Sequence, residues 1–166
     1  MFSGIFHIVV RTIEEWGPRK KYSKEAGYRD DLVEYLRGTL KRRAGNYVVQ
    51  RESGRHLADI GVVNSTKVGI ELKLNFRKQR QLDTLIGQIG RFLSDYSHVI
   101  IVLCGYVDEE KLDSLRHRLR KIENPMPFAL QPQRIKIISK GETKGARQEE
   151  RFTPSLMDII LGPSRK

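Results

Sequence analysis

The sequence predicts an α/β fold, with helices flanking both faces of a central mixed β-sheet. Apolar residues first recur at helical spacing, over about 5–16 and 23–43, and then form short runs typical of strands, over 47–50, 57–63 and 68–74. Helical and strand patterns alternate along the rest of the chain. Such alternation favours a sheet that is covered by helices on both sides.

The first elements have clear boundaries. Gly17-Pro18 ends the first predicted helix, and a basic linker over 19–21 follows. Ser23 is a suitable N-cap for the second helix, which we expect to reach about Arg43. Turn residues at Ser53-Gly54 and Asn64-Ser65 separate the three strands. The remaining expected elements are a helix over about 82–93, a buried strand over 98–104, a charged helix from Asp108 to about Ile122, a strand over 134–139, a polar loop over 141–150 and a short helix that opens at Thr153-Pro154.

The length of 166 residues and the hydrophobic content of 39% suit one domain with one core. We therefore expect a single domain over 1–166. Its expected parts are an N-terminal helix and basic linker over 1–22, a core over about 23–140, and a loop and C-terminal helix over 141–166.

The charge balance favours a polyanionic partner. The net charge of +11 is typical of proteins that bind nucleic acid or an anionic membrane surface. No apolar stretch approaches the roughly 20 residues of a membrane span, and we expect no membrane partner. The single cysteine, Cys104, excludes an internal disulfide and suggests a core thiol in a reducing, cytoplasmic setting. The histidines form no zinc pattern, and the lack of a P-loop argues against a nucleotide cofactor.

Three charged residues interrupt two of the predicted strands. Asp59 lies in one apolar run, and Glu71 and Lys73 lie in the next. Because alternate strand residues point to one side, Glu71 and Lys73 share a side that Leu72 does not. Charges within apolar strands are costly unless they are paired or hold a metal ion, so the pattern predicts a magnesium site suited to phosphodiester hydrolysis. The alternatives are a polar, solvent-facing side of an edge strand for Glu71 and Lys73, and an ordinary turn or strand-end acid for Asp59.

The arrangement resembles the PD-(D/E)XK nuclease superfamily, over about 23–105. Asp59, Glu71 and Lys73 match the charged positions of the family motif, whereas Ala58 stands where the family name has Pro. The resemblance implies a restriction-endonuclease-like core and Mg²⁺ or Mn²⁺ bound by Asp59, Glu71 and the backbone carbonyl of Leu72. It also implies that Lys73 positions the attacking water and stabilises charge on the phosphate.

Members of this superfamily often add an acid from the first core helix. Glu25 is our preferred candidate, since on a helical wheel it heads the inward face, and Asp31 is the alternative at the edge of that face. Glu25 could instead simply favour the positive end of the helix dipole. The resemblance also suggests a site role for Gln88, which is as readily read as a boundary residue of its helix. Phe92, four residues on, stands where the related pattern has Tyr.

Basic residues flank the motif and could neutralise phosphates. They are Arg51, Arg55, His56, Arg77, Lys78 and Arg80. A second basic stripe over 116–121 lies on the charged helix. Each of these side chains alone could be ordinary solvated surface.

The sequence therefore favours a Mg²⁺-dependent endonuclease acting on DNA, including branched DNA such as junctions, and working as a homodimer. Three alternatives stay open. They are a non-catalytic nucleic-acid-binding module with the same fold, an RNA-directed nuclease, and a partner-binding protein whose basic surface is incidental.

Overall fold

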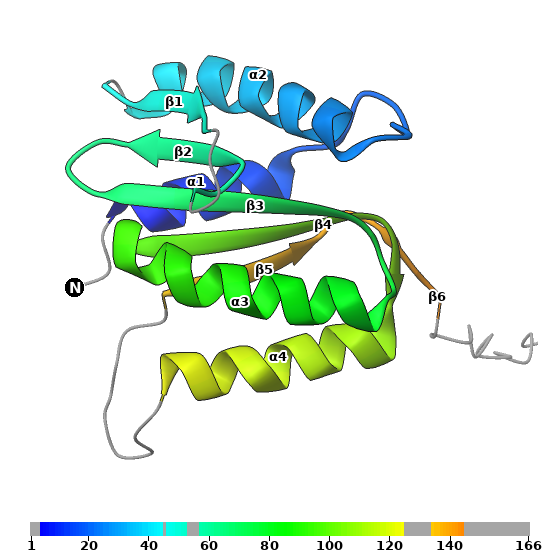
Figure 1. The fold of residues 1–166 in the computed structure, drawn as a ribbon. Coiled ribbons are helices and arrows are strands. Elements are labelled where there is room, and N and C mark those ends of the chain that lie inside the picture. Colours follow the sequence, from blue (N-terminus) through cyan, green and yellow to red (C-terminus); the bar gives the residue numbers. More distant parts are fainter. Residues whose placement is uncertain (1–3, 45, 53–56, 125–133, 145–166) are drawn as a thin grey trace, which may run out of the picture.

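A computed structural model describes residues 4–44, 46–52, 57–124 and 134–144 (Figure 1). Its elements in chain order are α1 (Gly4–Glu15), α2 (Glu25–Ala44), β1 (Val48–Arg51), β2 (Ile60–Val63), β3 (Lys67–Phe76), α3 (Gln79–Asp95), β4 (His98–Asp108), α4 (Glu109–Glu123), β5 (Ile135–Ser139) and β6 (Glu142–Lys144). The predicted α/β class is confirmed. The helix expected at Thr153-Pro154 and the turn expected at Ser53-Gly54 lie outside the described residues.

One mixed sheet connects the strands in the order β1-β2-β3-β4-β5. β1, β2 and β3 form an antiparallel meander, whereas β4 runs parallel to both β3 and β5. The hairpin between β2 and β3 turns at the predicted Asn64-Ser65, where the Asn64 N–H donates to the Thr66 carbonyl over 3.1 Å. The helix α3 makes the crossover from β3 to its parallel neighbour β4 (Figure 1).

Apolar side chains form two separate clusters. Val9 of α1 and Leu36 of α2 belong to one cluster, together with Ile100 of β4. Leu85 of α3 belongs to the other, together with the next strand residue, Ile101. The buried strands thus contribute consecutive residues to different clusters, which is why β4 reads as an unbroken apolar run rather than an alternating one.

Several boundaries differ from the expected ones; α2 begins at Glu25, so Ser23 does not directly precede it as an N-cap, and α3 begins already at Gln79. β2 begins at Ile60 rather than at residue 57, so Asp59 precedes the strand. β4 continues to Asp108 through Gly105, whose φ of 69° few other residues adopt. The polar segment expected as a loop from residue 141 instead starts with β6, which pairs with the extended end of β4. No helix of the described residues combines the length and apolarity that a membrane crossing needs.

Candidate functional site

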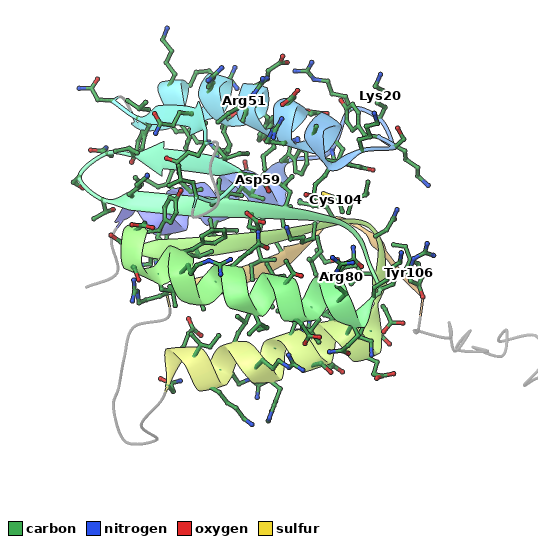
Figure 2. The ribbon with its side chains drawn as sticks, viewed as in Figure 1. Lys20, Arg51, Asp59, Arg80, Cys104 and Tyr106 are labelled. Atoms are coloured by element: carbon green, nitrogen blue, oxygen red, sulfur yellow. The ribbon has the colours of Figure 1, made fainter. Side chains whose placement is uncertain are left out.

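The candidate site lies where β3 continues past its partner β2. The pairing between them ends at Ile60 and Ile70, and β3 runs on to Phe76 with β4 along its other side. Asp59, directly before β2, therefore lies beside the continuing part of β3 (Figure 2).

Two carboxylates bind the backbone of this continuing part. Asp59 Oδ2 accepts a hydrogen bond from the Leu72 N–H over 2.8 Å, and Glu25 Oε2 accepts one from the Leu74 N–H over 3.0 Å. These N–H groups would otherwise lack a strand partner, and a buried backbone donor without an acceptor is costly. Hydrogen bonds to the backbone of β3 thus bring together Glu25, from α2, and Asp59, from the segment directly before β2.

Glu71 and Lys73 point to the other side of β3 from Ile70, Leu72 and Leu74, as predicted. The three apolar residues contact the cluster that includes α1 and α2. Glu71 Oε1 and Lys73 Nζ are 2.5 Å apart, and only 3% of Glu71 is exposed. Such burial rules out the alternative of a solvent-facing polar side for Glu71.

The electrostatics show that the four charged groups influence one another. Burial is the main reason why the pKa of Glu71 rises to about 7. Asp59 and Glu25 raise it further, and Lys73 partly opposes the shift. Burial is also the main cause of the raised pKa of Glu25. Burial alone would lower the pKa of Lys73, but the neighbouring carboxylates of Glu71, Glu25 and Asp59 together outweigh it and the pKa is raised. Three carboxylates therefore share one ammonium in a poorly solvated place.

The donor chemistry of this place fits a small divalent cation. A buried carboxylate that is reluctant to ionise beside other carboxylates would be stabilised by a nearby positive charge. The N–H and C=O of one strand residue point to the same side, so the Leu72 carbonyl faces the side on which Asp59 binds the Leu72 N–H. Two carboxylates and a carbonyl form a hard oxygen set, and Mg²⁺ keeps several waters in sites of this kind. Within the described residues, no group of three or more acidic, histidine or cysteine side chains is arranged to hold a metal ion.

Asp31, the alternative helix acid, has a different environment. Its carboxylate accepts hydrogen bonds from the Arg19 N–H over 2.9 Å and from the Tyr22 hydroxyl over 2.8 Å. The Trp16 indole N–H is also directed to it, over 3.4 Å. Asp31 therefore fastens the segment between α1 and α2 to α2, and Glu25 is the helix acid that reaches β3.

Gln88 lies on α3 and is half-buried. Its side-chain oxygen Oε1 is buried and has no hydrogen-bond partner among the described residues. No hydrogen bond of the described residues joins Gln88 to Asp59, Glu71 or Lys73, so its predicted site role stays a prediction.

The predicted phosphate contacts fall into two groups. Arg51 is the last residue of β1 and forms an ion pair with Asp30 over 3.2 Å, close to the segment that contains Asp59 (Figure 2). Arg77, Lys78 and Arg80 are exposed where β3 ends and α3 begins. The other two predicted contacts, Arg55 and His56, lie outside the described residues.

The remaining predictions concern Cys104 and the stripe on α4. Cys104 is buried and free, as expected of a core thiol, and burial raises its pKa to about 12. On α4, Arg116 pairs with Asp113 over 2.9 Å and Arg118 pairs with Asp83 over 2.7 Å. These ion pairs partly neutralise the second basic stripe.

Comparison with known proteins gives little further information. No family model matches the chain, and neither does any curated protein. Among solved structures, the chain is similar to the restriction endonuclease FokI bound to DNA, with 11% sequence identity and a TM-score of 0.35. The match covers 84% of this chain and 28% of that chain, so the present chain spans less than a third of that protein. A likeness of this degree shows neither family nor activity.

One feature near the site was missed in the sequence. A cavity of about 510 Å³ opens at the ends of β3, β4 and β5, and its lining includes Lys20, Tyr106 and Lys140. These residues come from three distant parts of the chain, so no local pattern joins them. The strand order alone could have indicated this place, because ligands of α/β sheets often bind at the carboxyl ends of parallel strands.

Proposed function

We propose that the protein is a metal-dependent endonuclease that hydrolyses phosphodiester bonds in DNA. The observation that carries the proposal is the meeting of Asp59, Glu71, Glu25 and Lys73 around the part of β3 that extends past β2. Structural ion pairs can also be buried, but three carboxylates surround the Lys73 ammonium, and Arg29 adds only a smaller opposing charge near Glu25, which leaves an excess of negative charge. A divalent cation is the simplest counter-charge for this excess.

Each residue has a role in this proposal. Asp59 and Glu71, with the Leu72 carbonyl, would bind Mg²⁺ or Mn²⁺. A cation bound there would supply Lewis acidity to a phosphate oxygen and lower the pKa of a bound water. The surrounding carboxylates, Glu71 above all, raise the pKa of Lys73, and its ammonium would stabilise negative charge on the phosphate. Glu25 would hold the strand through the Leu74 N–H and orient a water near the same place.

The substrate proposal rests on the surface charge. The net charge of +11 favours a polyanion, and Arg77, Lys78 and Arg80 are exposed just beyond Lys73 along the chain. Branched DNA such as a junction belongs to the same proposal. So does a restriction-endonuclease-like core with helices on both faces of the sheet, which is supported by the separate clusters of Ile100 and Ile101.

A cleavage assay tests the proposal. Wild type and Glu71→Ala are incubated with supercoiled plasmid and with four-way-junction DNA, in Mg²⁺, in Mn²⁺ or in EDTA. We expect cutting by the wild type with either cation, none in EDTA, and a loss of at least about a hundredfold in Glu71→Ala, by analogy with the loss of a transition-state contact. The matched control is Glu109→Ala, because Glu109 is exposed at the start of α4 and is not among the groups that shift the pKa of Glu71.

The outcomes separate the alternatives. Equal cutting by wild type and Glu71→Ala would contradict the site assignment. Metal-independent, salt-sensitive binding without cutting would favour the binding module, and cutting of RNA but not DNA would favour the RNA-directed nuclease. We also propose a homodimer, because one site cuts one strand and a duplex has two. A dimer predicts that linear plasmid appears directly, without build-up of nicked circles.

A further inference from the structure

The cavity at the strand ends has a fixed and unusual backbone. β3 and β4 pair regularly up to Leu74 and Cys104, and the register then shifts so that Phe76 faces Val107. The shift places Asn75 at a φ of 52° and Gly105 at a φ of 69°, both in the left-handed region. Bulges of this kind redirect side chains beside functional sites.

Asn75 locks this bulge in place. Its side-chain Oδ1 accepts a hydrogen bond from the Tyr106 N–H over 3.0 Å. A Cβ atom at Gly105 would lie 2.5 Å from the same oxygen, so only glycine fits. Tyr106, whose backbone N–H is held by this hydrogen bond, lines the cavity, and Figure 2 shows it at the same end of the molecule as Lys20.

The cavity is positively charged. Lys20, Lys21 and Lys140 line it, and none of the described lining residues is acidic. The Lys140 ammonium donates to a neutral group, the Glu14 carbonyl, over 2.6 Å, and burial lowers the pKa of Lys140. The Glu14 carboxylate also acts on this ammonium and partly opposes the shift, so an anion in the cavity would add to the counter-charge that Lys140 already has.

The cavity also has aromatic walls. Tyr22, Tyr28 and Tyr106 line it. The Tyr22 and Tyr28 rings meet edge to face with centroids 5.1 Å apart, and the Tyr22 hydroxyl is fixed by its bond to Asp31. Rigid aromatic rings next to lysines are the combination that proteins use to bind unpaired nucleotides, by stacking and by phosphate contact.

We propose that this cavity binds an unpaired nucleotide of the DNA strand, with its phosphate on the lysines and its base against the tyrosines. Its volume of about 510 Å³ lies within the range of small-ligand sites. Leu74 and Asn75 line it and directly follow Lys73, so the cavity begins within about 7 Å of the site along the strand. The assignment rests on the proposed nuclease function and narrows its substrate to DNA with a single-stranded branch or end.

DNA binding measured without a metal ion tests the assignment of the cavity separately from cleavage. Fluorescence anisotropy in EDTA compares a blunt duplex with the same duplex carrying a single-stranded tail, for wild type, Lys20→Ala, Tyr106→Ala and Tyr106→Phe. We expect the wild type to prefer the tailed DNA. Lys20→Ala and Tyr106→Ala should each weaken its binding by roughly tenfold, with less than about a twofold effect on the blunt duplex. Tyr106→Phe, which keeps the ring, should bind as the wild type does. So should Lys41→Ala, a change at an exposed lysine of α2 that does not line the cavity.

Each outcome is decisive for one of the two proposals. An equal loss on both DNA forms, or no preference for the tail in the wild type, would overturn the cavity assignment. Competition by deoxyadenosine monophosphate as strong as that by the tailed DNA would also overturn it, because a free nucleotide would then be the ligand. If the tail preference depends on Lys20 and Tyr106 while no DNA is cut in Mg²⁺, the nuclease proposal fails and the binding assignment stands.

Discussion

At the scale of single residues, we expect the protonation of Glu71 to decide whether the proposed site can bind a cation. Its pKa of about 7 lies well above the ordinary value of 4.5, because the carboxyl is buried near other carboxylates. An acid whose pKa is raised by folding binds its proton more tightly in the folded state. The free energy of unfolding contributed by Glu71 therefore falls as the pH rises from about 4.5 to about 7.

The affinity for a divalent cation should instead rise as the pH rises. A protonated Glu71 cannot bind a metal ion, so we expect Mn²⁺ affinity to rise about tenfold per pH unit below 7 and to level off above it. Titration calorimetry between slightly acidic and slightly alkaline pH measures this dependence. Glu71→Gln should show weak binding without the pH step. A wild-type affinity that does not change with pH would contradict the role given to Glu71.

At the scale of elements, α2 carries two acids with opposite effects on stability. Burial opposes the ionisation of Asp31, but the hydrogen bonds from the Arg19 N–H, Tyr22 and Trp16 outweigh it and lower its pKa. The stability that this carboxylate contributes is present above the ordinary pKa of 3.8 and is lost as the pH falls through its lowered value. The raised pKa of Glu25 means instead that its charge is disfavoured by folding.

Two substitutions on α2 test this contrast. Asp31→Asn should lower the free energy of unfolding by about 2 kcal/mol at neutral pH, because buried hydrogen bonds to a charge are lost. Glu25→Gln should leave it unchanged or raise it slightly. Urea unfolding at neutral pH and near pH 3, below the ordinary pKa of Asp31, measures both. The Asp31→Asn deficit should shrink at the lower pH, and a deficit of the same size at both would contradict this account.

The sequence could predict what depends on local periodicity. Alternation along a strand is enough to put Glu71 and Lys73 on one side of β3, and the helical wheel is enough to favour Glu25. The hydrogen bond from the Leu72 N–H to Asp59 could not be predicted, because it depends on β2 beginning only after residue 59. The left-handed Asn75 and the pairing of β6 with β4 depend likewise on contacts between distant segments.

At the scale of the whole molecule, excess positive charge should make DNA binding strongly dependent on salt. If Lys78 and Arg80 each contact a phosphate, changing both to Ala should reduce the slope of log affinity against log salt by about 2. Anisotropy in EDTA at several salt concentrations measures the slope. Arg116→Ala is the control, since Arg116 is already paired with Asp113 and should change the slope little. Equal slopes for the wild type and the double variant would remove these residues from the interface.

The central claim is that Asp59 and Glu71 bind one divalent cation beside β3. Anomalous diffraction from crystals soaked in Mn²⁺ tests it most directly. We expect a peak in contact with both carboxylates and the Leu72 carbonyl, and none there in Glu71→Ala crystals. A peak elsewhere, or an Asp59 carboxylate that remains on the Leu72 N–H with no ion beside it at saturating Mn²⁺, would contradict the claim.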